Sequence, residues 1–443
     1  MENLLLNLDV IDDKTDVGSY FIATYPPFSV WSAAHVPAAL RTIGTAATDP
    51  NAPLGLYLHI PFCRKRCKFC YFRIFTGKNS DEVETYLTAL SQEVELYADS
   101  AMAANRPLNF VYFGGGTPSF LSSDQLQRLM DRVGDKWRRT DDCEGSFECE
   151  PGTLRKGKLE TIKAIGTTRL SLGIEHFDDE VLVENGRAHD SGDIHKSFEW
   201  AREVGFDQIN VDLIAGMVGD TEPKWKRTID ETLTLDPDSV TIYQMELPPN
   251  STYAREARES GEAPAVADWP TKRAWVDYAL RQFESAGYVM TSAYTVVKPE
   301  GDGRFVYRDA VWRGLDMIGT GVASFSHFDG LHVQNFDKWD GYIDPLSRGE
   351  WPIARAYPTS QDERLIREFV LQLKFGRLQA APFREQYGVD VTERFADELE
   401  MLTDRQMLIV ENDGITLTRE GLLRVDSLLP NFFEPKFRNI PYS

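Results

Sequence analysis

The chain has 443 residues, of which 42% are hydrophobic, and its 48 Lys and Arg against 69 Asp and Glu give a formal net charge of −21. This length and composition suit a globular protein with one large core domain and smaller appendages. A chain with this net negative charge does not have the excess of Lys and Arg that is typical of nucleic-acid-binding proteins, so nucleic acid is not an expected partner. No apolar run approaches the roughly 20 residues of a membrane helix, and the N-terminus is acidic rather than signal-like. We therefore expect a cytoplasmic protein that has no membrane partner.

Residues 1–52 are predicted to form an N-terminal arm over a larger body. They carry aromatic residues and prolines, including the YPPF segment at 25–28, without the sustained periodicity of a helix or strand.

The next part of the chain, residues 53–300, alternates short apolar runs with longer amphipathic stretches. Helices are expected at Val83–Leu96, from Ser123, at 192–205 and at 221–235. The apolar runs predict six strands: LYLHI, LNFVYF, SFECE, RLSLGIE, QINVDLI and SVTIYQM. Six strand–helix units in series predict an α/β protein with a parallel sheet, in the form of a partial (β/α)6 barrel of the TIM type.

The alternation loosens towards the C-terminus. Thr291–Val297 and Arg304–Tyr307 are predicted edge strands, and 301–359 is assigned to an extension of the barrel. Residues 360–443 are expected to form a C-terminal domain, with helices at 363–376 and 391–406 and a hairpin that turns at Asn412-Asp413-Gly414. This order resembles a winged helix. Because the tail offers no basic helix, a lid or packing role is favoured over DNA binding.

Three of the five cysteines, Cys63, Cys67 and Cys70, lie within eight residues directly after the first predicted strand. Three thiolates can hold a 4Fe-4S cluster and leave one iron open to chelate the amino and carboxylate groups of S-adenosylmethionine (SAM). Zinc is the alternative, but a structural zinc site needs a second Cys or His pair, and none is nearby. Cys143 and Cys149 are interpreted as small buried residues. The seven histidines show no metal-ligand spacing.

A run of three glycines, Gly114 to Gly116, follows the second predicted strand and precedes Thr117-Pro118. Glycine lets a backbone approach a ligand closely, although the same run is also typical of a tight strand-to-helix turn. Next to the cysteine motif, it predicts that these amides meet the amino end of SAM.

Seven segments appear in one order along the chain: YLHIPFC with its cysteines, YFGGGTPSFL, FECEPGTL, RLSLGIEHFD, NGRAHD, INVDLIAG and YQMELP. In these segments the chain resembles the radical SAM superfamily, and specifically its branch of enzymes like oxygen-independent coproporphyrinogen III oxidase. The resemblance implies a 4Fe-4S cluster and SAM as cofactors. It also implies that one set of residues contacts the cluster-bound SAM: Tyr57, Gly115, Glu148, Glu175, Arg187 and Asp212.

Each of these residues also has a structural interpretation, as a strand-end cap, a packed aromatic or a surface ion pair. Glu175 departs from the oxidases, which carry glutamine in that motif. The branch can hold a second SAM, and the resemblance implies that a further set of residues lines it: Phe69, Gly116, Thr117, Met245 and Phe325. Core packing is the alternative for the two phenylalanines and Met245. Two SAM molecules are therefore expected from the resemblance alone.

Three functions occur in this branch: decarboxylation of porphyrinogen propionates, haem handling by a chaperone, and transfer of a methyl or methylene group from the second SAM. The oxidases follow the third cysteine with Cys-x-Cys, whereas this chain has Tyr71-Phe72-Arg73, and its YQMELPPNS loop also departs from theirs. The arm before the first strand disfavours a chaperone. These departures favour a class C radical SAM methylase or cyclopropanating enzyme, with the oxidase and the haem-binding chaperone as alternatives.

In that scheme a 5′-deoxyadenosyl radical abstracts hydrogen from the methyl group of the second SAM, and the product adds to an sp2 carbon of a small molecule, often in natural-product biosynthesis. Glu246 and Tyr243, near the end of the sixth strand, are predicted to move the proton. A helix cap and a core tyrosine are their structural alternatives. The expected electron donor is a protein such as flavodoxin or ferredoxin.

Overall fold

A computed structural model of the chain describes residues 25–262, 264–300, 303–438 and 440. Residues 1–24 of the predicted arm lie outside them. Among the described residues, no helix combines the length and the apolar character that crossing a membrane requires.

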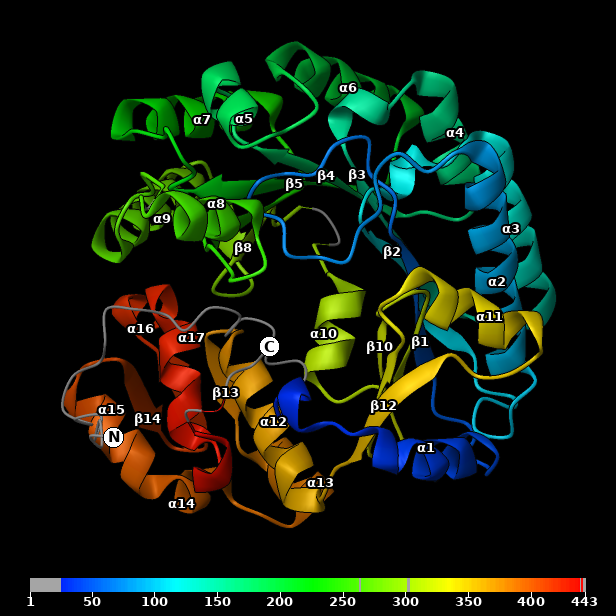
Figure 1. Ribbon diagram of the computed structural model, residues 1–443. Helices are drawn as coiled ribbons and strands as arrows, with labels where there is room; N and C mark the ends of the chain where they lie inside the picture. The colour runs from blue at the N-terminus through cyan, green and yellow to red at the C-terminus, as the bar shows by residue number, and fades with distance from the viewer. Residues whose placement is uncertain (1–24, 263, 301–302, 439, 441–443) are drawn as a thin grey trace.

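The six predicted strands form a parallel sheet in sequence order, which confirms the α/β partial barrel (Figure 1). Each strand buries an apolar run, as expected for a sheet covered on both faces. The strands are β1 (Leu54–Ile60), β2 (Leu108–Gly115), β3 (Arg139–Cys149), β4 (Arg169–Glu175), β5 (Gln208–Ala215) and β6 (Ser239–Gln244).

Helices surround the outer face of this sheet (Figure 1). Capping boxes at Asn79 and Ser122 fix where α2 and α3 begin, because each side chain accepts a hydrogen bond from an otherwise unpaired amide of the first turn. The helices of this part are α2 (Ser80–Ala98), α3 (Ser123–Lys136), α4 (Lys156–Ala164), α5 (Asp179–Glu184), α6 (Ser191–Val204), α7 (Glu222–Leu235), α8 (Thr252–Ser260) and α9 (Trp269–Ser285), with single 3-10 turns at Pro118–Phe120 and Pro151–Thr153.

Further strands extend both edges of the parallel sheet, which has twelve strands among the described residues. At one edge β9 (Met317–Thr320) runs parallel to β1, and β10 (Phe325–Phe328), β11 (Leu331–Asn335) and β12 (Ile353–Pro358) follow in antiparallel pairs, with α11 (Trp339–Ser347) between the last two. At the other edge β8 (Thr295–Val297) and β7 (Val289–Met290) run antiparallel. The edge strand predicted at Thr291–Val297 is therefore confirmed only from Thr295.

The strand predicted at Arg304–Tyr307 is wrong, because residues from Val306 onward form helix α10 (Val306–Trp312). The Glu144 carboxylate accepts hydrogen bonds from the amides of Val306 (2.9 Å) and Tyr307 (3.3 Å), and so satisfies donors that the first turn of a helix leaves unpaired. A side chain 162 residues before Val306 thus stabilises this helix, and local periodicity does not show it.

The described part of the arm comprises 3-10 turns at Phe28–Val30 and Ala33–His35 and helix α1 (Val36–Ile43). Trp31 stacks on His332 of β11 at 4.8 Å between ring centroids, and Tyr25 packs against Phe433 at 4.7 Å. The arm thus contacts both the extended sheet edge and the C-terminal segment.

The C-terminal segment has its own apolar core. The predicted hairpin is confirmed as β14 and β15, but the helix predicted at 391–406 is split in two at Phe395, whose buried ring packs on Phe369 at 4.5 Å. The elements are α12 (Gln361–Leu373), β13 (Arg377–Gln379), α13 (Ala381–Tyr387), α14 (Val391–Arg394), α15 (Ala396–Asp404), β14 (Leu408–Glu411), β15 (Gly414–Leu417), α16 (Arg419–Leu423) and α17 (Val425–Leu428), then 3-10 turns at Leu429–Phe432 and Pro435–Phe437.

Gly145 of β3 allows a very close approach of two backbones, since a Cβ at this position would lie 2.1 Å from the Gly166 carbonyl oxygen. We expect Gly145→Ala to lower the free energy of unfolding by about 1–3 kcal/mol through overpacking. The matched control is Gly134→Ala in α3, where a Cβ meets no atom within 4 Å, and alanine should raise stability by up to about 1 kcal/mol. Urea unfolding of the two variants measures both effects, and equal midpoints would contradict the packing.

Candidate cofactor and active site

The three clustered cysteines lie on the loop that leaves the carboxyl end of β1 (Figure 1). Backbone hydrogen bonds hold this loop: Cys63 N donates to Phe75 O at 3.1 Å, and Lys68 N donates to Asn185 O at 3.0 Å. All three thiols are free and half-buried. Cys149 is buried as predicted, whereas Cys143 is half-buried.

Polar side chains contact two of the three sulfurs. Thr117 Oγ1 donates to Cys63 Sγ at 3.3 Å, and Arg187 Nη1 donates to Cys67 Sγ at 3.2 Å. Burial raises the pKa of Cys63 to about 11 and that of Cys70 to about 12, so both are neutral thiols until a metal displaces their protons.

The residues present fit an iron–sulfur cluster. Among the described residues, no group of three or more Cys, His, Asp or Glu side chains is arranged to hold a single metal ion. The Nε atoms of Arg66 and Arg187 are buried and have no partner among the described residues. Buried donors beside three thiolates suit an anionic cluster, because hydrogen bonds to its sulfurs and cations nearby stabilise its charge.

Glu148 is the end of a hydrogen-bonded chain beside the cysteine loop. Its carboxyl group accepts from Tyr112 Oη at 2.6 Å and from the Gly115 amide at 3.2 Å. The ring of Tyr57 stacks on that of Tyr112 at 5.6 Å between centroids and an interplanar angle of 13°. Two strands and the glycine run thus bring together Tyr57, Gly115 and Glu148.

Glu175 ends β4 in a left-handed conformation, with φ of 66°, while His176 N donates to Ile174 O at 2.9 Å across it. Non-glycine residues in this region are strained and cluster at functional sites. The Glu175 carboxylate lies 3.4 Å from Arg187 Nη2, which also donates to Gly173 O at 2.6 Å. Arg187 therefore links the Glu175 carboxylate to the sulfur of Cys67.

Three acidic side chains, Glu148, Glu175 and Asp212, lie close together, and the pKa of each is raised. Burial is the main cause and their mutual repulsion adds to it, so the pKa of Glu148 and that of Glu175 rise to about 7. Burial likewise raises the pKa of Asp212, although Ser171 donates to it at 2.7 Å. Such a group is suited to a cationic ligand, and SAM carries a sulfonium and an ammonium group.

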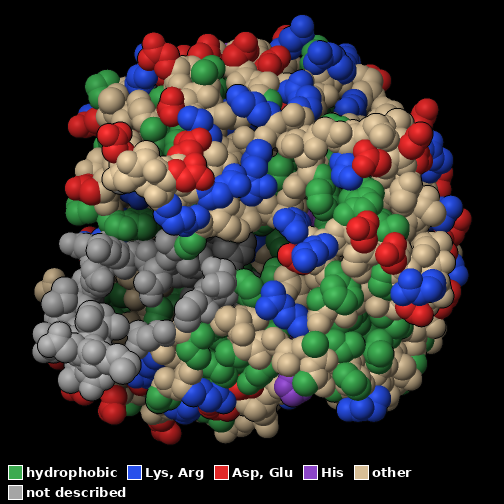
Figure 2. All heavy atoms as spheres, viewed as in Figure 1, with side chains coloured by type: hydrophobic (Ala, Val, Ile, Leu, Met, Phe, Trp, Pro, Cys, Tyr) green, Lys and Arg blue, Asp and Glu red, His purple; other side chains and the backbone are tan. Residues whose placement is uncertain are grey.

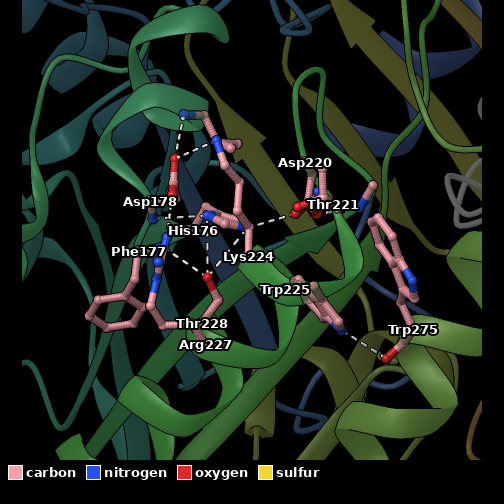
Figure 3. Close-up of polar contacts among 12 residues, drawn as sticks. His176, Phe177, Asp178, Asp220, Thr221, Lys224, Trp225, Arg227, Thr228 and Trp275 are labelled. Carbon is pink, nitrogen blue, oxygen red and sulfur yellow. Dashed lines mark hydrogen bonds and ion pairs between the residues drawn. The ribbon is translucent and has the colours of Figure 1, made fainter.

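His176 joins the loops that follow β4 and β5, as Figure 3 shows. Its Nε2 lies 3.1 Å from Asp220 Oδ1, and its Nδ1 accepts from the Asp178 amide at 2.9 Å. Both His176 and Asp220 are fully buried. The sequence gives no local signal for this pair, because 44 residues separate its members. The His176–Asp220 contact fixes the turn that follows Glu175.

The residues predicted for a second SAM lie in three places. Phe69 and Met245 belong to one apolar cluster, with Val218 and Tyr253. The Gly116 and Thr117 amides donate to Ile60 O (2.8 Å) and Phe62 O (2.9 Å), so the backbone donors of these two residues are already paired.

Phe325, the remaining member of that set, packs against Trp31 of the arm at 5.5 Å between centroids. Because β10 begins beside the carboxyl end of β9, Phe325 still lies at the same sheet edge as the cysteine loop.

The two predicted acid–base residues lie at the carboxyl end of β6. Tyr243 is 39% exposed, so it is not a core tyrosine, and its ring lies 6.4 Å from that of Tyr294. Glu246 is half-buried and near Lys272, whose pKa falls to about 8 because burial outweighs the attraction of that carboxylate. Lys272 Nζ donates to Met245 O at 2.7 Å, and this buried cation was not predicted.

Aromatic side chains at the start of helix α10 pack beneath the carboxyl cluster, and the sequence did not predict them. The ring of Tyr307 lies 4.2 Å from that of Tyr112, and Arg169 stacks over Phe305 at 3.8 Å. Since Tyr112 donates a hydrogen bond to Glu148, helix α10 also supports the carboxyl cluster.

Comparison with known proteins agrees with this geometry. The family model of the radical SAM superfamily matches residues 57–232, and that of the HemN C-terminal domain matches residues 359–424. The chain belongs to the radical SAM superfamily. It is a radical SAM enzyme whose cofactors are a 4Fe-4S cluster and SAM, and within the superfamily it resembles both the oxygen-independent coproporphyrinogen III oxidases and the haem chaperone HemW.

Curated and solved relatives cover nearly the whole chain. The oxygen-independent coproporphyrinogen III oxidase of Synechocystis is 25% identical over 95% of this chain and 93% of its own length. The haem chaperone HemW of Bacillus subtilis is 27% identical over 83% of this chain and 96% of its own. The structure of coproporphyrinogen III oxidase (HemN) from Escherichia coli superposes with a TM-score of 0.80 at 25% identity, covering 93% of this chain and 98% of that one.

Cys63→Ala, Cys67→Ala and Cys70→Ala should each abolish stable binding of the cluster, because two thiolates are too few to hold it. The control is Cys143→Ala, which lies in β3 outside the loop. After anaerobic reconstitution we expect about four irons per chain in the wild type and the control, measured by iron assay and visible absorption. Full iron in any of the three loop variants would contradict the assignment.

SAM affinity should strengthen as pH rises through about 7, because Glu148 and Glu175 become carboxylates that attract a cation. Glu175→Gln removes one of these charges and should reduce the change in affinity between pH 6 and pH 8 by up to about tenfold. Titration of the reconstituted protein with SAM measures the difference, since ionisation of SAM itself is common to both proteins. Identical pH profiles would place Glu175 away from the ligand.

Proposed function

We propose that this radical SAM enzyme removes CO2 oxidatively from a small molecule that carries propionate-like carboxylates, the reaction class of coproporphyrinogen III oxidase. The observation that carries the proposal is the similarity to those oxidases over 93% of this chain and 98% of the solved structure, which spans the barrel and the C-terminal segment together. The curated oxidases give the same support at 25–27% identity.

When bound, the cluster supplies the electron that cleaves SAM into methionine and a 5′-deoxyadenosyl radical. The residues of the chain position the reactants. Glu148, Glu175 and Asp212 would hold the cationic part of SAM. Arg187 would bridge the Glu175 carboxylate and the Cys67 thiolate. Tyr57 and Tyr112 would form an apolar wall that keeps water from the radical.

Basic side chains near the cysteine loop suit an anionic substrate. Figure 2 shows Lys and Arg side chains gathered on this face of the molecule. The loop itself carries Arg64, Lys65 and Lys68. Local positive charge would attract carboxylates despite the net charge of −21. The same face would receive the electron donor, for which an acidic redox protein such as flavodoxin or ferredoxin has complementary charge.

Methyl or methylene transfer from a second SAM is the other candidate, and one departure from the oxidases and one packing arrangement favour it. Tyr71 and Phe72 follow the third cysteine where the oxidases have Cys-x-Cys, and Phe69 and Met245 share one apolar cluster beside the loop. In that case Tyr243 and Glu246 would be the acid–base pair, because both lie at the end of β6.

One anaerobic assay separates the two reactions. The reconstituted protein receives dithionite, methyl-deuterated SAM and coproporphyrinogen III, with Cys67→Ala as the blank. We expect 5′-deoxyadenosine with release of CO2 and no label in the product. Deuterium in an organic product together with S-adenosylhomocysteine would instead support transfer. If no reductant yields 5′-deoxyadenosine, the enzyme proposal fails and a haem-binding role is favoured.

A further inference from the structure

A cavity lies at the opposite end of the barrel from the cysteine loop. Its lining includes Val297, which pairs with Ser239, the first residue of β6, so the cavity adjoins the amino end of that strand. The cysteines follow the carboxyl end of β1. Barrel enzymes place their chemistry at the carboxyl ends of the strands, so a ligand in this cavity is not the substrate of the radical.

The cavity has a volume of about 650 Å³, which lies within the range of small-molecule sites. Three parts of the chain line it: the sheet edge through Thr291 and Lys298, helix α10 through Arg308 and Arg313, and the C-terminal segment through Phe375 and Arg377. A ligand bound there would contact all three parts at once.

Five cationic side chains line this cavity, although the chain as a whole carries a net charge of −21. They are Lys298, Arg304, Arg308, Arg313 and Arg377. Asp309 is the one carboxylate among the described lining residues, and Arg308 binds it at 2.7 Å. Lys298 binds Asp236 at 2.6 Å. The lining therefore carries more positive than negative charge.

The arginines are held by neighbouring groups. Arg308 is 7% exposed, and its guanidinium donates to Ser292 Oγ at 3.2 Å and lies over the ring of Phe375 at 5.7 Å. The Arg313 guanidinium lies over the same ring, 5.1 Å from its centroid. A guanidinium fixed by packing loses less conformational entropy when it binds an oxyanion, and its fork matches phosphate and carboxylate oxygens.

We propose that this cavity binds a small oxyanionic molecule that carries phosphate groups or several carboxylates. Arg313 and Arg377 would reach the ligand from helix α10 and from the C-terminal segment, and Arg308 would form the buried base of the site. Binding would join α10 to the C-terminal segment across the amino end of the barrel.

Isothermal titration of the full-length protein tests the site independently of SAM cleavage. Fructose 1,6-bisphosphate is the phosphate probe and tricarballylate the carboxylate probe, each at fixed ionic strength so that general screening is constant. We expect saturable binding of at least one probe, and the tighter of the two identifies the source of the oxyanion. The absence of saturable binding by both probes would overturn the proposal.

The variant is the double substitution Arg313→Gln with Arg377→Gln, in which both side chains are exposed and the fold should persist. We expect its affinity to fall by at least about tenfold, because two charge-assisted hydrogen bonds are lost. The matched control is Arg128→Gln with Arg348→Gln, two exposed arginines outside the cavity, and its affinity should equal that of the wild type. Wild-type affinity in the cavity variant, or an equal loss in the control, would contradict the site.

Discussion

The active site depends on the burial of three acidic side chains, which lie on the neighbouring strands β3, β4 and β5. Removing a carboxylate from water costs several kcal/mol unless a partner compensates. Two guanidinium groups, those of Arg169 and Arg187, lie near Glu148, Glu175 and Asp212, and the pKa of each acid is still raised. A cationic ligand supplies the missing charge, so the fold is arranged for SAM rather than for a neutral cofactor.

Arg187 connects this charge to the iron-binding loop. It contacts Cys67 Sγ, the Gly173 carbonyl and Glu175. Burial lowers the pKa of Arg187, but Cys67, Glu175 and Glu150 raise it to a net increase. The loop backbone is attached to the same region, since Lys68 N donates to Asn185 O. A displacement of the cysteine loop would therefore also displace the residues around the carboxyl cluster. This coupling suits an enzyme whose cofactor and cosubstrate must be in direct contact.

The sequence predicts the barrel well, because six buried apolar runs alternate with amphipathic helices and the cysteine spacing is local. It also predicts that Tyr57, Gly115, Glu148 and Arg187 converge, through their places in recognised motifs. It does not predict helix α10, which depends on Glu144, or the His176–Asp220 pair, which depends on two distant loops. The left-handed backbone of Glu175 and the occupied amides of Gly116 and Thr117 likewise follow from tertiary contacts that periodicity does not show.

The three thiolates would leave one iron of the cluster open to the amino and carboxylate groups of SAM. Electron–nuclear double resonance of the reduced cluster, with SAM labelled by 15N at the amino group and 17O at the carboxylate, observes that bond directly. Hyperfine coupling from both labels is expected in the wild type. A reduced cluster that shows neither coupling at saturating SAM, because every iron is already bound by the protein, would contradict it.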